Sequence, residues 1–126
     1  MSDIHIPGTR QTPTVDFRFS ENLLKLSGEA YPENAVTFFE PLNAAVEAYL
    51  AASSEPVNVE FDLRYLNSAA TKMIFKLGGI LNKAAEHRLV SLRFVVVEDD
   101  EMVQDLGADF QTDYSWINFQ FVEVAL

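Results

Sequence analysis

Three segments of this chain alternate apolar and polar residues, and this alternation constrains the fold more than any other feature. The apolar members are Val57, Val59 and Phe61 in the first segment, Val90, Leu92 and Phe94 in the second, and Ile117, Phe119 and Phe121 in the third. Successive side chains of a strand point to opposite faces of its sheet, so each segment predicts a strand with one apolar face. Strands covered on both faces would be apolar throughout. We therefore expect a sheet with helices on one face and a second face that is open.

The intervening segments predict the rest of an α/β fold. A β-hairpin is expected at residues 15–19 and 23–28, because its apolar residues alternate on either side of a polar turn. Helices are expected over residues 32–50, 68–87 and about 99–107, and the three strands over residues 57–62, 90–97 and 117–124. Pro41 falls inside the first helical pattern, where the missing N–H predicts a kink or a break.

The order of elements is therefore β-β-α-β-α-β-α-β, in one domain spanning residues 1–126. Residues 1–13 contain two prolines and a glycine and predict an extended N-terminal arm. Right-handed crossovers make the later strands parallel, which gives a mixed sheet.

Composition excludes several classes of protein. The chain has 126 residues and no cysteine, so disulfide scaffolds, thiolate metal sites and cysteine nucleophiles are ruled out. It has no apolar run long enough to cross a bilayer, and its N-terminus lacks the basic and apolar blocks of a signal peptide. We therefore expect a cytoplasmic protein with no direct membrane insertion.

The charge of the chain is negative and unevenly distributed. The formal net charge is −10, which predicts no general binding of nucleic acid because the phosphate backbone would be repelled. The segment from Arg64 to Arg93 nevertheless holds six basic residues and one acidic residue, so it carries +5 while the rest carries −15. This polarity indicates a protein with one specialised face.

The helix expected after residue 67 concentrates that basic charge. At about 100° per residue, its core side is formed by Ala70, Met73, Leu77, Ile80, Leu81 and Ala84. Lys72, Lys76 and Lys83 form a basic ridge on the far side, with Ser68, Phe75 and Gly79 beside it. Phe75 either packs beneath a neighbouring segment or is exposed as part of a docking surface. An exposed aromatic residue rimmed by charge is typical of an interface, so the second interpretation predicts that Asn67, Ser68, Lys72, Phe75, Lys76 and Gly79 bind a partner.

Ser68 also has two interpretations. Asn67 and Ser68 are both good N-cap residues, because a short side-chain oxygen can accept a hydrogen bond from a free amide of the first turn. The same free amides and the helix dipole also stabilise a phosphate. A phosphoryl group on Ser68 would place nearly two negative charges beside Lys72 and could switch a docking surface.

Other candidate sites are weaker. Glu60 and Asp62 share one strand face and could form a carboxylate pair for acid–base chemistry, or could simply be hydrated on the open face. The acidic residues 98–101 lack the spacing of a calcium loop, and His5 and His87 stand in no metal-ligand spacing. No Walker loop, dinucleotide-binding glycine motif or nucleophile elbow is present. We expect no catalytic residues, metal or cofactor.

Three short motifs follow one another along the chain. They are Ile4-His5-Ile6-Pro7-Gly8-Thr9 with Thr12-Pro13 after it, Gly28-Glu29-Ala30-Tyr31-Pro32-Glu33-Asn34, and Asp62-Leu63-Arg64-Tyr65-Leu66-Asn67-Ser68 with Lys72 beyond it. In sequence, order and spacing they resemble the SiaC family of bacterial regulatory phosphoproteins, and the resemblance covers essentially the whole chain.

The resemblance implies a fold similar to STAS domains and anti-sigma-factor antagonists, and a switch instead of an enzyme. A kinase would phosphorylate one hydroxyl at the N-terminus of the helix after the central strand, and a PP2C-like phosphatase would remove the phosphate. The unmodified form would bind and activate a diguanylate cyclase, raising cyclic di-GMP and favouring biofilm growth. The acceptor, usually threonine in the family motif, matches Ser68 here, and Thr71 is the second candidate.

Two alternatives remain open from the sequence. One is an antagonist of an anti-sigma factor, which would use Ser68 in the same way but act on transcription. The other is a small enzyme or ligand-binding domain that uses Glu60 and Asp62 on the open sheet face.

Overall fold

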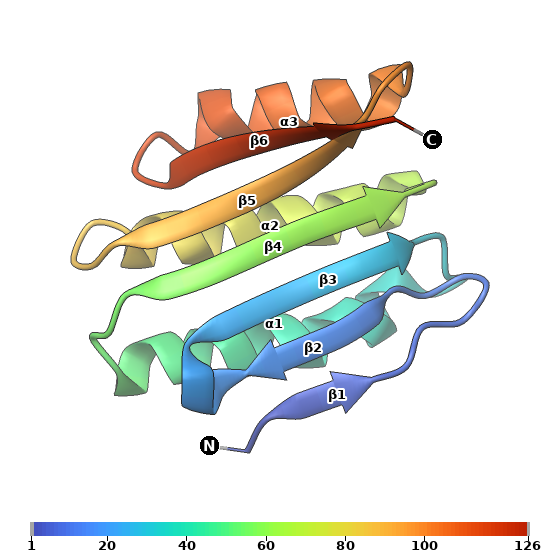
Figure 1. The fold of residues 1–126 in the computed structure, drawn as a ribbon. Coiled ribbons are helices and arrows are strands. Elements are labelled where there is room, and N and C mark those ends of the chain that lie inside the picture. Colours follow the sequence, from blue (N-terminus) through green and yellow to red (C-terminus); the bar gives the residue numbers. More distant parts are fainter. Residues whose placement is uncertain (1, 126) are drawn as a thin grey trace.

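The chain folds into one mixed sheet with three helices packed on one face. This computed structural model describes residues 2–125. The strands are β1 (Ile4–Ile6), β2 (Thr14–Arg18), β3 (Leu23–Glu29), β4 (Val57–Arg64), β5 (Val90–Val97) and β6 (Asn118–Val124). The helices are α1 (Ala35–Ala52), α2 (Ser68–Ala84) and α3 (Glu101–Asp113), and all three lie behind the sheet in Figure 1.

The topology explains why the helices share one face. The strands lie in chain order, β1 to β6; β1, β2 and β3 are antiparallel, whereas β3, β4, β5 and β6 run parallel. From β3 onward each crossover connects a strand to its next neighbour on the same side, so the chain crosses the sheet in one direction. Right-handed crossovers that advance in one direction all place their helices on the same face of the sheet. The predicted α/β architecture, with a mixed sheet and one open face, is confirmed.

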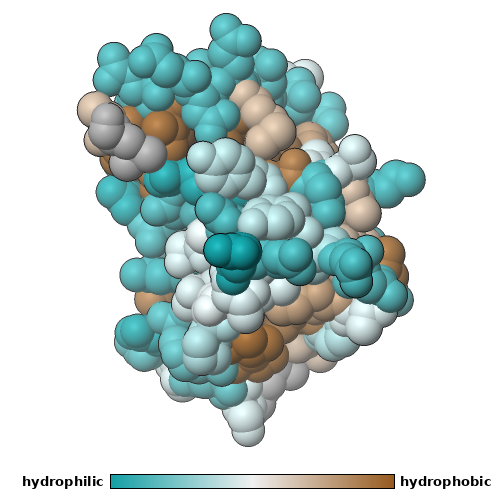
Figure 2. All heavy atoms as spheres, turned by 90° about the vertical axis from the view of Figure 1, so that its right-hand side faces the viewer, coloured by the Kyte–Doolittle hydropathy of each residue, from teal (hydrophilic) through white to brown (hydrophobic). Residues whose placement is uncertain are grey.

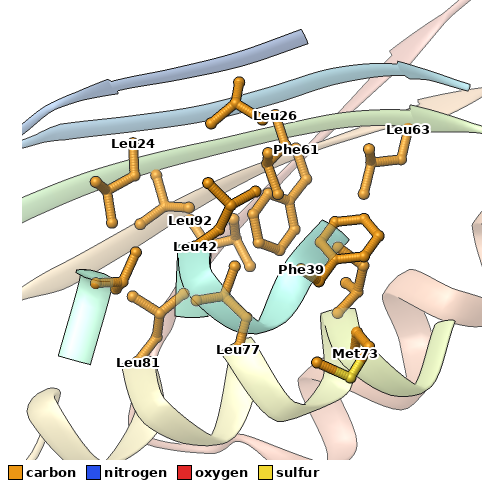
Figure 3. Close-up of a cluster of buried hydrophobic side chains, with 14 of the residues drawn as sticks. Leu24, Leu26, Phe39, Leu42, Phe61, Leu63, Met73, Leu77, Leu81 and Leu92 are labelled. Atoms are coloured by element: carbon orange, nitrogen blue, oxygen red, sulfur yellow. The ribbon is translucent and has the colours of Figure 1, made fainter. Parts of the chain in front are cut away.

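The core lies between the sheet and this layer of helices (Figure 3). The sheet contributes the inward members of its alternating strands, including Leu24, Leu26, Phe61, Leu63 and Leu92. The helices contribute the opposing side chains, including Phe39, Leu42, Met73, Leu77 and Leu81. All ten are at most 6% exposed, so burial of apolar surface between the two layers supplies the main stabilisation of the fold.

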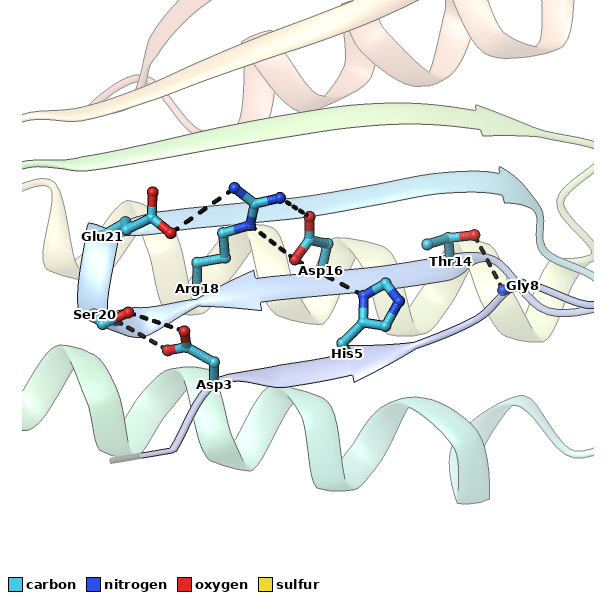
Figure 4. Close-up of polar contacts among 8 residues, drawn as sticks. All are labelled: Asp3, His5, Gly8, Thr14, Asp16, Arg18, Ser20 and Glu21. Carbon is cyan, nitrogen blue, oxygen red and sulfur yellow. Dashed lines mark hydrogen bonds and ion pairs between the residues drawn. The ribbon is translucent and has the colours of Figure 1, made fainter.

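The N-terminal segment is more ordered than the predicted extended arm. Residues Ile4–Ile6 form the edge strand β1, which pairs antiparallel with β2. Asp3 accepts hydrogen bonds from the amide and hydroxyl of Ser20, at 3.1 and 2.9 Å, and these bonds lower the pKa of Asp3 (Figure 4). The prediction missed β1 because a three-residue strand has too short an alternation to identify, and its partner decides its conformation.

The first helix differs from the prediction at two points. It begins at Ala35 instead of residue 32, because Asn34 is the N-cap and accepts a hydrogen bond from the amide of Thr37 at 3.1 Å. It also continues through Pro41 without a break. Pro41 lies on the exposed side of α1, where water can bind the carbonyl group that the proline leaves unpaired.

The other boundaries need smaller corrections. Helix α2 begins at Ser68 as predicted but ends at Ala84, before the expected His87. Helix α3 extends to Asp113, although the predicted helix ended near Gly107. Gly107 is buried in the middle of α3, and a Cβ atom there would lie 2.8 Å from Phe121 Cε1. This glycine therefore permits close packing of α3 on the sheet instead of ending the helix.

Candidate functional site

Ser68 lies at the end of the molecule where the parallel strands finish and the three helices begin. This end is on the right in Figure 1 and faces the viewer in Figure 2, where hydrophilic side chains cover most of it, with apolar patches between them. Ser68 is the first residue of α2 and is exposed. The sequence-based expectation of an accessible hydroxyl at a helix N-terminus therefore agrees with the structure.

Asn67, and not Ser68, is the N-cap of α2. Its Oδ1 atom accepts a hydrogen bond from the amide of Ala70 at 2.8 Å, while its Nδ2 atom donates to the carbonyl of Pro32 at 3.1 Å. The backbone amide of Asn67 also donates to the carbonyl of Ala30 at 3.1 Å. Asn67 therefore ties the start of α2 to the segment that precedes α1, and it leaves Ser68 free of a capping role.

The two candidate hydroxyl groups differ in their hydrogen bonds. Thr71 is half-buried, and its Oγ1 atom donates to the carbonyl of Asn67 at 3.0 Å. The Ser68 hydroxyl has no hydrogen-bond partner within residues 2–125. A modifying enzyme would have to break an existing bond to use Thr71, but not to use Ser68.

The surroundings of Ser68 favour an anion. The backbone amides of Ser68 and Ala69 have no hydrogen-bond partner among the described residues, as is usual in the first turn of a helix. Their N–H groups and the helix dipole give this position partial positive charge. Lys72 lies one turn further along α2 and is exposed, so a phosphate on Ser68 would be near a full positive charge as well.

The basic ridge is exposed as predicted, whereas Phe75 is not. Lys72, Lys76 and Lys83 are all exposed, but Phe75 is half-buried against α3. The centroid of its ring lies 4.6 Å from that of Phe110. Phe75 therefore packs beneath a neighbouring segment, which is α3. It also lines an open hollow with Thr71 and Met102, so its part in a docking surface stays a prediction.

The packing of α3 on α2 also explains Gly78, the first of two adjacent glycines in α2, but not Gly79. A Cβ atom on Gly78 would lie 2.5 Å from Phe110 Cε1 and 2.5 Å from Tyr114 Cε2, so only glycine lets α3 approach this closely. A Cβ atom on Gly79 would make an ordinary contact, 3.7 Å from the Tyr114 hydroxyl. That hydroxyl donates to the carbonyl of Phe75 at 2.6 Å, and burial, followed by the charge of Asp113, raises the pKa of Tyr114. Gly78 thus serves contact within the chain.

Two exposed apolar residues near Ser68 were not assigned to the surface from the sequence. Tyr65, in the segment between β4 and α2, is 66% exposed, and Met102, in the first turn of α3, is 47% exposed. Both line an open hollow of about 700 Å³ whose other walls carry the carboxylates of Glu29, Glu98, Asp99, Asp100 and Glu101. The position of Tyr65 directly after a strand and before an N-cap was the only sequence signal for its exposure.

The alternative site on the open sheet face is formed of ion pairs. Glu60 lies between Lys25, at 3.8 Å, and Arg93, and Asp62 pairs with Arg64 at 2.7 Å. Glu60 lines an open hollow of about 350 Å³ together with both of its cations, whereas Asp62 does not line it. The two carboxylates therefore do not share one site, and each has a cation as its immediate partner. This arrangement does not support the enzyme interpretation.

The remaining candidate residues are also accounted for by local contacts. Asp100 of the acidic run is the N-cap of α3 and accepts from the amide of Val103 at 3.2 Å. His5 lies 4.0 Å from Asp16 on the open face. Within residues 2–125, no three His, Asp or Glu side chains are grouped as metal ligands would be, and no helix is long and apolar enough to span a membrane.

Comparison with known proteins decides the family. The family model of the SiaC regulatory phosphoproteins matches residues 6–124. The chain belongs to the SiaC family.

Relatives and solved structures agree with this assignment. An uncharacterized protein of Pseudomonas aeruginosa is 34% identical over 117 residues, which span 92% of this chain and 93% of that protein. The chain also resembles SiaC of Pseudomonas aeruginosa, at 32% identity and a TM-score of 0.86, over the full length of both chains. A further match is the crystal structure of the diguanylate cyclase SiaD in complex with its activator SiaC, at 32% identity and a TM-score of 0.89, covering 97% of this chain and 100% of that one.

Proposed function

We propose that this protein is a phosphorylation-switched activator of a diguanylate cyclase, acting in the cytoplasm and having no catalytic activity of its own. The observation that carries the proposal is the Ser68 hydroxyl, which is exposed at the N-terminus of α2 and has no hydrogen-bond partner among residues 2–125. Family membership supports it, because the similar SiaC of Pseudomonas aeruginosa is the activator of the cyclase SiaD. In this proposal the unmodified protein binds its cyclase, a kinase phosphorylates Ser68, and a PP2C-like phosphatase restores the active form.

The proposed docking surface surrounds Ser68. Its polar part is formed by Asn67, Ser68, Lys72 and Lys76, and its apolar part by Tyr65 and Met102, the exposed residues of the adjoining hollow. Phe75 and Gly79 lie at the margin of this surface beside α3, where both are half-buried, and Phe75 lines a hollow with Met102. A partner would cover apolar side chains next to Ser68, which is why a modification there can change affinity.

A phosphate on Ser68 would act through charge and hydration. It would add about two negative charges at pH 7, held by the free amides of the first turn and by Lys72. The group would also bring a bound layer of water to the border of an apolar contact, and removing that water on docking costs free energy. Because the phosphate suits the helix N-terminus, the fold itself would be unchanged and only the surface would differ.

The test compares two substitutions of the acceptor. Ser68→Ala is expected to bind the cyclase as the unmodified protein does, whereas Ser68→Asp is expected to bind about tenfold more weakly or worse, as measured by calorimetric titration. Thr71→Ala is the matched control, since it removes a neighbouring hydroxyl that is already hydrogen-bonded. Equal affinity of the Ala and Asp variants at position 68 would refute the switch.

Site mapping on protein from the native cells gives an independent check. Mass spectrometry should find the phosphate on Ser68, and treatment with a PP2C-like phosphatase should remove it. A phosphate found on Thr71 instead would show that the acceptor had been wrongly assigned.

A further inference from the structure

Strand β6 forms one edge of the sheet, and one row of its backbone hydrogen-bonding groups has no partner in the described part of the chain. Within residues 2–125 it pairs only with β5. The carbonyl of Val124 accepts from the amide of Glu98 at 2.8 Å, on the β5 side of the strand. Because both backbone groups of a strand residue point the same way and alternate along the strand, the amides and carbonyls of Phe119, Phe121 and Glu123 point outward, away from the sheet.

This edge lacks the features by which proteins usually prevent strand pairing. Natural edge strands are short, or carry lysine, proline or a bulge. Strand β6 has seven residues, Asn-Phe-Gln-Phe-Val-Glu-Val, with no proline, no basic residue and one acidic residue. Its register with β5 is uninterrupted from Asn118 to Val124. The opposite edge, β1, has only three residues and is followed directly by Pro7.

Apolar side chains border the unused backbone groups. Phe121 is 41% exposed although its ring lies 6.0 Å from that of Phe94 and stacks with Phe119 at 5.8 Å. These contacts place both β6 rings on the helix side of the sheet. Val122 and Val124 lie on the open side, beside their register partners in β5, and remain half-buried. A strand added at this edge would cover apolar surface on both faces.

The charge near β6 bears on whether a second copy of this chain can approach this edge. Two copies of a chain with net charge −10 repel one another over most of their surface. The acidic residues Asp105 and Asp109 of α3 line a hollow with Phe75, on the side of α2. At about 100° per residue, Gln104, Ala108 and Gln111 fall on the other flank of α3, with Glu101 of the first turn beside them. The flank away from α2 therefore carries a single acid, near the N-terminal end of the helix, and repels a second copy less than the side of Asp105 and Asp109 does.

We propose that β6 pairs antiparallel with β6 of a second copy of this chain, centred on Phe121, and joins the two sheets into one. In this register Phe121 of one copy lies opposite Phe121 of the other, and Glu123 of each copy lies opposite Phe119 of the other. Each outward amide of one strand therefore meets an outward carbonyl of the other strand. Glu123, the only acidic residue of the strand, therefore faces a phenylalanine instead of Glu123 of the other copy. The arrangement has the two-fold symmetry of most homodimers, and it uses residues distant in sequence from Ser68.

The first test is sedimentation of the full chain over micromolar to near-millimolar concentrations, with two variants of Glu123. Glu123→Pro removes an outward amide that the single chain does not use, whereas Glu123→Ala removes the same charge and keeps that amide. The original chain and the Ala variant are expected to dimerise, and the Pro variant to dimerise about tenfold more weakly or worse, because two symmetry-related hydrogen bonds are lost. Dimerisation equal in the Pro and Ala variants would overturn the proposal.

Hydrogen exchange of the unsubstituted chain tests the same proposal without depending on how any variant folds. The amides of Phe119, Phe121 and Glu123 should exchange more slowly as protein concentration rises, while those of Gln120 and Val122, which point towards β5, should be protected throughout. Fast exchange of the three outward amides at every concentration would overturn the dimer. Protection that arises only on adding a different protein would assign this edge to that protein and would also overturn it.

Discussion

Alanine substitution of the two neighbouring glycines of α2 should have opposite effects on stability. Gly78→Ala would place a methyl group 2.5 Å from Phe110 Cε1 and 2.5 Å from Tyr114 Cε2. Neither ring can move away easily, because Phe110 is fully buried against Phe61 and Tyr114 is fixed by its hydrogen bond to the Phe75 carbonyl. Gly79→Ala adds the same methyl group one residue further on, where it would lie 3.7 Å from the Tyr114 hydroxyl, an ordinary contact.

The magnitudes follow from two opposing effects. Alanine favours a helix over glycine by about 1 kcal/mol at either position. At Gly78 the overpacking costs about 1–3 kcal/mol, so the net effect on the free energy of unfolding is a loss of up to about 2 kcal/mol. At Gly79 no such cost applies, and a gain of about 0.5–1 kcal/mol is expected. The difference between the variants, about 1–3 kcal/mol, isolates the packing of α3 on α2 because the helix preference cancels.

Urea unfolding measured by circular dichroism gives this difference directly. The same difference should separate the two melting temperatures by about 3–10 °C in a domain of this size. If Gly78→Ala stabilised the protein as much as Gly79→Ala does, α3 could not lie against Gly78, and the argument for the covered position of Phe75 would fail with it.

Three further perturbations test the surroundings of the site. Phe75→Ala should lower the free energy of unfolding by about 1–3 kcal/mol, because its ring is half-buried on Phe110. Lys76→Ala is the control at an exposed neighbour and should change the free energy of unfolding by less than about 0.5 kcal/mol. Equal effects of the two substitutions would contradict the burial of Phe75. Asn67→Ala should cost about 1–2 kcal/mol in a thermal melt through loss of the N-cap of α2, and an unchanged melting temperature would show that the cap contributes nothing. Burial raises the pKa of Tyr114 and Tyr49 above the usual 10.0, so their stabilising contribution is complete below about pH 10 and is lost as pH rises through the raised pKa. Tyr114→Phe should reduce that alkaline loss in urea titrations at several pH values, and an unaltered pH profile would exclude Tyr114 as its source.

The sequence determined the features that depend on neighbouring residues. Strand alternation is a local pattern, so Val57, Val59 and Phe61 identified the inner face of β4 before any contact was known. The chain order of strands and helices then fixed which face the helices cover, because crossovers have one preferred hand. The start of α2 was also predictable, since a capping residue requires only the amides of the following turn. The three family motifs likewise singled out Ser68 from the sequence alone.

The tertiary structure decided which distant segments meet. Helical periodicity placed Phe75 away from the sheet, but only the packing of α3, some 35 residues further along, showed that its ring is covered by Phe110. The role of Gly78, the pairing of β1 and the exposure of Tyr65 beside Met102 depend in the same way on partners remote in sequence. A repeating pattern specifies the direction of a side chain relative to its own element, whereas burial depends on what other elements place opposite it. The accessible serine was therefore visible in the sequence, and the surface that surrounds it was not.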